Sequence, residues 1–506
     1  MKSINRKLPV LIAMSVGLSG LLAACGGGAA KPSADPASVS GNGASKLSPV
    51  ELVWYYPQWS TQPDTASVEE AINKITKEKI NATIKLRPTD GASYEQKLNT
   101  MVASNETFDI AWTSFWSFNY AQNARKGAFV QLDAMLDGTA PNLKKTLPPV
   151  VWEALKVDGK TYGILNYQTI TNKEGFLVQK KYIEKYGLDV SSVKKLEDME
   201  PFFLKIKQAE PDVIPFSMTR GGKFEGMKTT YNNLELISNY VGIYRNDKDL
   251  KVVDIVATPE YKSYLELMHS WYQKGIINKD APTLKSDKEN LKAGKVVSYF
   301  HNVLKPGRED EERTAFGNND VVAIPITQPF VGTNTIIQSI QAISKTSKHP
   351  DRALQFLELL NSDKDLLNTV AFGIEGKHYT KIDERTIKPI PNGGYDPNQT
   401  WVFGNGFNAY LREGQKPEIV QQTLKENETA VASPILGFTF DPQPVLTEIA
   451  NIQAVSDQYG PPLNTGAVDP KEKLNEYIEK RKKANVDKII AEMQRQLDEW
   501  KAANKK

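Results

Sequence analysis

The chain has 506 residues, 24% of them charged, and a formal net charge of +3 at neutral pH. Three positive charges lie within the first seven residues, so the rest of the chain is close to neutral, which argues against a nucleic-acid partner and against a polybasic membrane patch. The single cysteine excludes an intramolecular disulfide, and the length predicts two to three domains' worth of core.

The first expected element is a secretory signal over residues 1–24. Lys2, Arg6 and Lys7 precede an apolar run that is too short and too interrupted to serve well as a spanning helix. The sequence LAAC that ends at Cys25 resembles the lipobox of bacterial lipoproteins. The resemblance implies that the Cys25 thiol carries diacylglycerol and that the signal is cut just before it. An ordinary signal with a chance cysteine is the alternative.

Residues 25–47 are rich in Gly, Ala, Ser and Pro, with few bulky side chains. Such a segment cannot bury enough apolar surface to offset its ordering entropy, so we expect a flexible tether. No later stretch is long and apolar enough to span a bilayer. The sequence thus predicts a folded body on a lipid tether at the extracellular face of the cell membrane.

The folded part begins with an alternation of strands and helices. Apolar strand patterns at 51–59, 82–88 and 108–114 alternate with helical patterns at 67–80 and 93–104. Short connections in this order predict right-handed crossovers and a parallel sheet. In such sheets ligands bind beyond the carboxyl ends of the strands.

The second half repeats this theme less regularly. Helices are predicted over 259–275 and 350–362, and a long charged helical stretch over 469–503. Strands are predicted at 213–219, 295–302, 320–327 and 335–344. The fold class is therefore α/β.

Common catalytic and metal signatures are missing from the sequence. The DGKT sequence at 158–161 lacks the earlier glycine of a phosphate-binding loop, and neither G-x-S-x-G nor H-E-x-x-H occurs. His269, His301, His349 and His378 lack metal-ligand spacing. We expect no metal and no cofactor. A carboxylate pair for glycoside hydrolysis remains open, although nothing singles one out.

Aromatic residues cluster at two predicted strand ends, over 54–59 and 112–120. Exposed aromatic faces there suit stacking on the C–H faces of sugar rings, with polar neighbours meeting the hydroxyls. A place in the core is the equal alternative for Trp59, Trp112 and Trp116. Trp271 and Trp500 lie on helical stripes and are assigned to the core. Because Trp54 and Tyr55 alternate in one strand, only one of them should face a cleft.

Motifs spread over some 400 residues resemble one family. The mature chain is similar to extracellular solute-binding lipoproteins of ABC importers, in the large carbohydrate-binding family and its Gram-positive subgroup with an extended C-terminal region. The motifs lie at 108–112, 124–136, 158–165, 175–189, 272–281, 292–300, 342–363, 372–380 and 437–466.

The resemblance implies a two-lobed, type II periplasmic-binding-protein-like fold with a ligand cleft between the lobes. Lobe one would hold 48–167 plus 345–395, and lobe two 168–344 plus 396–506. Hinge strain is expected at Gly175 and near 166–170 and 332–336.

The implied function is capture of a carbohydrate, expected to be an oligosaccharide, by a monomer that delivers it to an ABC permease without catalysis. The alternatives are a surface-anchored polysaccharide-cleaving enzyme and a binding protein for a non-sugar solute. The candidate ligand-binding residues are Tyr55, Trp59, Asp90, Trp112, Ser114, Trp116, Asn166, Arg220, His301 and Trp401.

Overall fold

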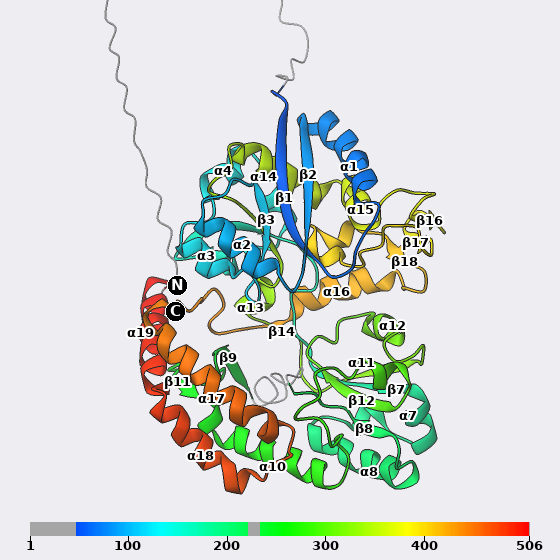
Figure 1. Cartoon of the computed structure of the whole chain (residues 1–506), viewed down its shortest axis with the longest axis vertical. Coiled ribbons are helices and arrows are strands. Elements are labelled where there is room, and N and C mark those ends of the chain that lie inside the picture. Colours follow the sequence, from blue (N-terminus) through cyan, green and yellow to red (C-terminus); the bar gives the residue numbers. More distant parts are fainter. Residues whose placement is uncertain (1–46, 221–232, 505–506) are drawn as a thin grey trace, which may run out of the picture. The chain divides into compact units, whose positions relative to one another are not determined.

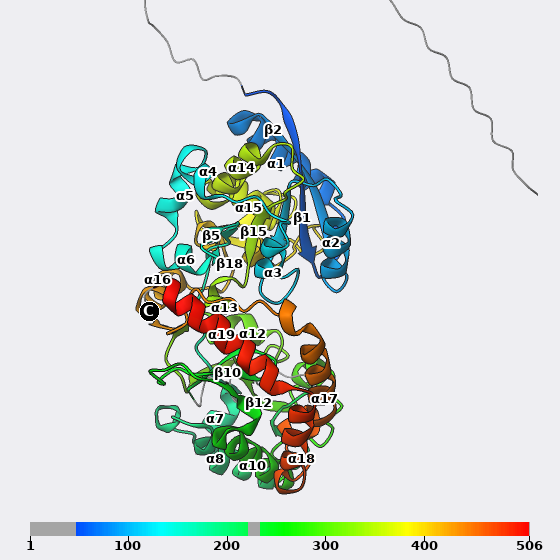
Figure 2. The same cartoon turned by 90° about the vertical axis from the view of Figure 1, so that its left-hand side faces the viewer.

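The computed structural model describes residues 47–220 and 233–504 (Figures 1 and 2). The predicted signal, Cys25 and all of the predicted tether except its last residue lie outside the described residues. Within the described ranges, every helix is too short or too polar to cross a membrane.

The first lobe is built on a mixed five-stranded sheet in the order β2-β1-β3-β15-β6. β1 pairs in parallel with β2 and β3, whereas β15 runs antiparallel to β3 and β6. The alternation over 51–114 thus forms the predicted parallel strands, whose carboxyl ends meet at one edge. The strands are β1 (Val50–Gln58), β2 (Ala82–Asp90), β3 (Ile110–Thr113), β15 (Ile340–Ile343) and β6 (Gly163–Leu165).

Helices cover both faces of this sheet, with α1, α14 and α15 together on one face and α2 on the other (Figure 2). In α1, buried Val68, Ile72, Thr76 and Ile80 recur at every fourth residue, and left-handed Asn81 ends the helix. The helices of this lobe are α1 (Thr65–Ile80), α2 (Tyr94–Ala103), α3 (Tyr120–Arg125), α4 (Asp133–Gly138), α5 (Pro141–Thr146), α6 (Pro149–Ala154), α14 (Pro350–Ser362) and α15 (Lys364–Phe372).

The second lobe holds a four-stranded sheet in the order β13-β7-β12-β8. Trp271 is fully buried in its core and donates a 2.8 Å hydrogen bond to Glu200, which confirms its assignment to the core. The strands are β13 (Val321–Pro325), β7 (Gly175–Gln179), β12 (Val296–His301) and β8 (Ile214–Phe216). The helices are α7 (Lys180–Tyr186), α8 (Glu200–Ala209), α10 (Pro259–Gln273), α11 (Lys288–Lys292) and α12 (Arg308–Arg313).

The C-terminal extension, which we define as residues 434–504, packs against a small antiparallel sheet in the order β11-β10-β9 (Figures 1 and 2). The predicted helical stretch over 469–503 is divided at Asn485, whose φ of 66° lies in the left-handed region. The elements are β9 (Leu234–Ser238), β10 (Val241–Tyr244), β11 (Val252–Asp254), α17 (Leu446–Asn464), α18 (Pro470–Lys483) and α19 (Val486–Asn504).

Three chain segments run side by side where the chain passes between the two sheets. Asn172 and Phe330 exchange two backbone hydrogen bonds of 2.8 Å, and β14 pairs in parallel with β19. Gly175, a predicted hinge position, is the first residue of β7, where an added Cβ would meet the carbonyl oxygen of Ile324 at 2.1 Å. Close approach of two strands explains this glycine. The elements here are β14 (Phe330–Val331), β19 (Val431–Ala432), α13 (Thr333–Ile336) and α16 (Glu418–Thr429).

The packing corrects the predicted lobe boundaries in two places. The predicted strand over 335–344 is a short helix followed by β15, and β15 belongs to the sheet of the first lobe. Phe403, assigned to the second lobe, packs in the first, with its ring 5.9 Å from Trp54 and 5.4 Å from Tyr56. The smaller strands are β4 (Lys156–Val157), β5 (Lys160–Thr161), β16 (Tyr379–Lys381), β17 (Thr386–Pro389) and β18 (Leu411–Arg412).

Candidate functional site

Three tryptophan rings gather beyond the carboxyl ends of β1 and β3. Trp59 follows β1, Trp116 follows β3, and Trp401 lies in a short 3-10 helix. Ring centroids are 5.2 Å apart for Trp59 and Trp401, 6.2 Å for Trp116 and Trp401, and 6.5 Å for Trp59 and Trp116. Trp59 is 50% exposed and Trp116 is 47% exposed. We call these three residues the tryptophan surface.

Trp112 supports this surface from below and is fully buried. Its ring meets Trp116 edge-on at 5.1 Å and Trp401 at 5.9 Å. The indole N–H of Trp116 donates to the carbonyl oxygen of Gln338 at 3.1 Å. Edge-on contacts and a fixed N–H hold the upper rings in place.

Ser339 connects the residues beneath the surface. Its hydroxyl oxygen accepts from the indole N–H of Trp112 at 2.8 Å and from the Asn166 amide at 2.9 Å. The hydroxyl donates to the carbonyl oxygen of Trp401 at 2.7 Å. One buried serine therefore fixes three predicted site residues, and the sequence carries no signal for it beyond its place between two apolar segments.

Gly91 is a second residue that sequence reasoning missed. A Cβ at this position would lie 2.4 Å from the indole nitrogen of Trp59, and the Gly91 amide donates to the carbonyl oxygen of Gln58 at 2.9 Å. The glycine thus lets the Trp59 ring lie against the turn after β2. Asp90, a predicted site residue, is exposed at this turn, where its carboxylate accepts from the backbone amide of Ala92 at 3.1 Å.

Buried side chains among the predicted site residues serve as supports. Ser114 and Asn166 are fully buried; the Ser114 hydroxyl oxygen accepts from the Trp116 amide at 3.2 Å. Tyr55, expected to bind ligand, is only 8% exposed, and its ring packs 5.9 Å from Phe108. Lys97 of α2 lies over the Tyr55 ring at 5.0 Å, so Tyr55 faces α2 instead of the tryptophan surface. Its neighbour Trp54 is buried on the other face of the sheet, against Phe356 of α14.

Tyr94 connects α2 to the strand ends by a hydrogen bond. Its hydroxyl donates to the carbonyl oxygen of Trp112 at 2.7 Å. Burial raises the pKa of Tyr94 well above its ordinary value, and the hydrogen bond to Trp112 opposes that rise only in part. The hydroxyl therefore stays protonated and keeps donating at any physiological pH.

The two remaining predicted site residues belong to the second lobe. Arg220 is exposed after β8, and its backbone amide donates to the carbonyl oxygen of Leu284 at 2.8 Å. His301 ends β12, and its Nδ1 accepts from the amide of Val303 at 2.9 Å. Neither belongs to the tryptophan surface, which is built entirely by the first lobe.

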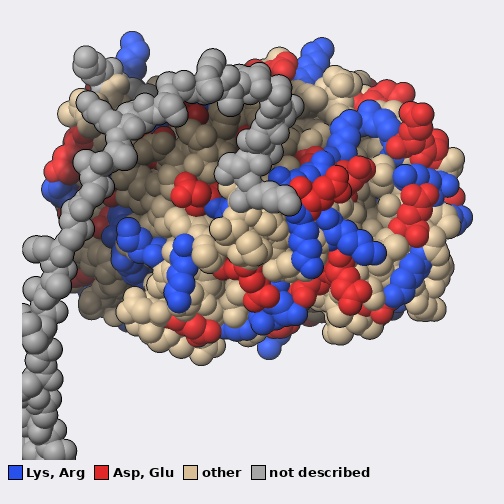
Figure 3. Space-filling model, turned by 90° about the horizontal axis from the view of Figure 1, so that it is seen from above, with Lys and Arg blue, Asp and Glu red and all other residues tan. Residues whose placement is uncertain are grey.

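The three side chains of the tryptophan surface are uncharged. The face of the molecule seen from above, shown in Figure 3, carries basic and acidic side chains interspersed. Among residues 47–220 and 233–504, no three His, Cys, Asp or Glu side chains are grouped so that they could hold a metal ion. The distinctive chemistry of the site is thus its aromatic surface.

Two family models match the chain. Residues 59–365 match the model described as bacterial extracellular solute-binding protein. Residues 434–502 match a domain of unknown function, DUF3502.

Relatives from Streptococcus pneumoniae resemble the chain over most of its length. A carbohydrate ABC transporter substrate-binding protein is 30% identical over 445 residues, which cover 85% of this chain and 86% of that protein. The crystal structure of an N-glycan transport solute-binding protein, NgtS, has a TM-score of 0.80 at 28% identity and covers 91% of this chain and 100% of its own.

Two further NgtS structures contain a glycan. The complex with Man1GlcNAc has a TM-score of 0.72 at 27% identity and covers 89% of this chain and 99% of its own. The complex with Man5GlcNAc has a TM-score of 0.69 at 28% identity and covers 91% of this chain and 100% of its own.

Proposed function

The chain belongs to the bacterial extracellular solute-binding proteins, and from this premise we propose that it captures an oligosaccharide on the tryptophan surface and passes it to an ABC permease. The observation that carries the proposal is the exposure of Trp59 and Trp116, which are half-exposed beside Trp401 at the carboxyl edge of the sheet. Large aromatic side chains usually bury most of their surface, so two exposed rings in contact mark a binding face.

The proposed ligand contains mannose and N-acetylglucosamine. The support is the likeness to NgtS, whose complexes with Man1GlcNAc and Man5GlcNAc cover nearly the whole of this chain. The flat apolar faces of these sugars match the indole rings, and their hydroxyls require polar groups at the rim.

A thermal-shift titration with Man1GlcNAc and Man5GlcNAc tests the ligand class. A ligand that binds only the folded state stabilises it by about 2.7 kcal/mol at a hundredfold excess over Kd, which raises the midpoint of unfolding. We expect a concentration-dependent rise with both glycans and none with polygalacturonate. No rise with either glycan would overturn the proposed class.

Capture is proposed to close the two lobes around the glycan. A ligand that contacts both lobes only in the closed form shifts the equilibrium by its differential affinity for that form. The closed form is then the state that the permease recognises. A monomer anchored through diacylglycerol on Cys25 at the outer face of the membrane would present this state next to the permease.

The protein is proposed to act without catalysis. The glycan recovered after long incubation at saturating protein should have an unchanged mass. Shortened products would favour a polysaccharide-cleaving enzyme instead.

A further inference from the structure

A cavity of about 350 Å³ is lined by Phe115, the residue that precedes Trp116. Its size is at the lower end of the range of about 300–1,000 Å³ that is typical of ligand pockets. Parts of both lobes and of the C-terminal extension line it, and we call it the extension pocket. Its lining includes Phe115, Gln122, Asn334, Glu235, Phe438 and Thr439.

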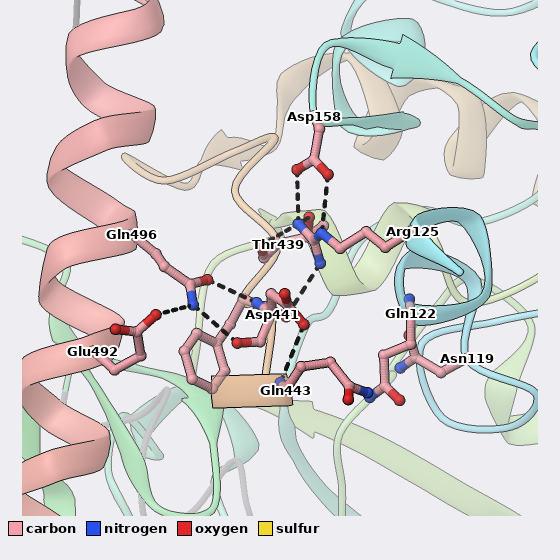
Figure 4. A network of polar contacts seen from close by, with 10 residues as sticks. Asn119, Gln122, Arg125, Asp158, Thr439, Asp441, Gln443, Glu492 and Gln496 are labelled. Carbon is pink, nitrogen blue, oxygen red and sulfur yellow. Dashed lines mark hydrogen bonds and ion pairs between the residues drawn. The ribbon is translucent and has the colours of Figure 1, made fainter. Parts of the chain in front are cut away.

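The C-terminal extension forms one wall of this pocket and is fastened to the first lobe beside it (Figure 4). Arg125 of α3 forms an ion pair with Asp158 and donates to the carbonyl oxygen of Thr439 at 2.9 Å. Asp441 exchanges two hydrogen bonds with Gln496 of α19, at 2.8 and 2.9 Å. This wall is therefore held from both sides.

The polar groups of the pocket suit a neutral, hydroxyl-rich ligand. The side-chain amides of Gln122 and Asn334 form no hydrogen bond with residues of 47–220 or 233–504. Phe115 is 39% exposed and offers an aromatic face. Free amide donors and acceptors next to an exposed ring are the groups that read sugar hydroxyls and C–H faces.

The pocket and the tryptophan surface meet at neighbouring residues of the chain. Phe115 lines the pocket and Trp116 is the next residue, so their Cα atoms are about 3.8 Å apart. The amide of Phe115 donates to the carbonyl oxygen of Ile337, and the indole of Trp116 donates to that of Gln338. The Phe115–Trp116 segment, fixed by these two hydrogen bonds, thus lies between the two places.

We propose that the extension pocket is a second subsite, which binds the distal residues of an oligosaccharide whose proximal residues lie on the tryptophan surface. The C-terminal extension, which matches a domain of unknown function, then has a role in selecting glycans by length. This inference rests on the proposed function, because it assigns a further part of the same ligand.

Calorimetric titration of the full chain with Man1GlcNAc and Man5GlcNAc tests the subsite. Gln122→Ala and Asn334→Ala should each lower the affinity for Man5GlcNAc about three- to tenfold, the range expected for one hydrogen bond, and leave Man1GlcNAc binding unchanged. Asn334→Trp, which fills the pocket from an exposed position, should lower Man5GlcNAc affinity at least about tenfold. Gln96→Ala, on exposed α2, is the matched control and should change neither affinity.

The outcomes separate this inference from the proposed function. Trp116→Ala should lower the affinity for both glycans. If it does so while the pocket variants change neither, the subsite is wrong and the proposed function stands. If the pocket variants lower the affinity for both glycans equally, the pocket is the primary site. That result would overturn its assignment to the distal sugar residues. If the wild-type protein binds neither glycan, the ligand class and the subsite both fail. Melting curves of each variant confirm that it is folded.

Discussion

Trp116 combines exposure with a fixed ring, and its truncation gives the most direct test of the site. Stacking adds roughly 0.5 to 1.5 kcal/mol beyond the burial of the ring, which itself contributes about 1.5 to 3 kcal/mol. Trp116→Ala should therefore weaken glycan binding at least about tenfold, as measured by calorimetric titration.

The melting temperature of the ligand-free Trp116→Ala variant should change little, because half of the ring is already exposed. Trp271→Ala provides the contrast, since truncating a fully buried tryptophan costs about 3 to 5 kcal/mol of stability. Unchanged affinity together with a collapsed melting temperature would return Trp116 to the core.

Glu235 makes stability depend on pH. Desolvation raises the pKa of Glu235 to about 7, although Ser433 donates to both carboxylate oxygens and Arg245 is near. Because the folded pKa lies above the ordinary value of 4.5, the folded state holds the proton more tightly, and stability falls as pH rises from about 4.5 to about 7.

The Glu235→Gln substitution should remove this pH-dependent loss of stability. We expect the stability of the wild-type protein relative to Glu235→Gln to drop by about 2 kcal/mol between pH 5 and pH 8, as measured by urea unfolding. Parallel stability curves for the two proteins over this range would contradict the assignment.

At the scale of elements, one buried ion pair holds the C-terminal helices to the small sheet. The fully buried guanidinium of Arg481 in α18 donates to Asp254 of β11 at 2.9 Å and to Ser456 of α17 at 3.1 Å. Arg481→Met leaves the Asp254 carboxylate buried without its partner, which should cost about 3 to 5 kcal/mol in urea unfolding.

The matched control for Arg481 is on the same helix. Lys482 is 55% exposed and pairs with Glu479 at 3.5 Å. Lys482→Met should change stability by less than about 1 kcal/mol, since exposed pairs contribute little. Equal losses in the two variants would show that helix α18, and not the buried pair, accounts for the effect.

The strand and helix order of the first lobe was predictable because its apolar periodicity is local. Residues 51–59 and 67–80 carry that pattern within single windows, and β1 and α1 form there. The segment 335–344 was wrongly predicted as one strand because it begins with three β-branched residues, Thr335 to Ile337, yet the first two of them end α13. Short apolar runs do not distinguish the two structures.

The site was only partly predictable because its contacts join distant residues. The sequence placed Trp59 and Trp116 at strand ends, where the structure has them. Trp401 lies against them because residues 402–403 pack on Trp54 and Tyr56. No local sequence pattern indicates this packing. Ser339, which fixes three of the predicted residues from beneath, has no local signal either.

At the scale of the whole molecule, ligand capture should change the radius of gyration. If the glycan contacts both lobes, small-angle scattering should give a smaller radius at saturating Man5GlcNAc than without it. Man1GlcNAc serves as the shorter comparison. An unchanged radius at saturation would exclude hinge closure while leaving binding intact.

The proposed anchoring through Cys25 is a second property of the whole molecule, and it can be tested by substitution. Cys25→Ser should yield unprocessed or released protein, because the hydroxyl does not take the thiol's place in acylation. Detergent phase separation and mass measurement check this. A Cys25→Ser protein that stays in the detergent phase with the normally processed mass would contradict lipidation.

The uneven burial of the tryptophans has an optical consequence. Trp54, Trp112 and Trp271 are fully buried, whereas Trp59 and Trp116 are half-exposed. An indole emits at shorter wavelength when water leaves its surroundings, so the buried rings supply a constant background and the exposed pair supplies the variable part of the signal. If the proposed glycan binds on that pair, it displaces water from the two rings and moves their emission to shorter wavelength. Intrinsic tryptophan fluorescence would then report glycan binding without a label.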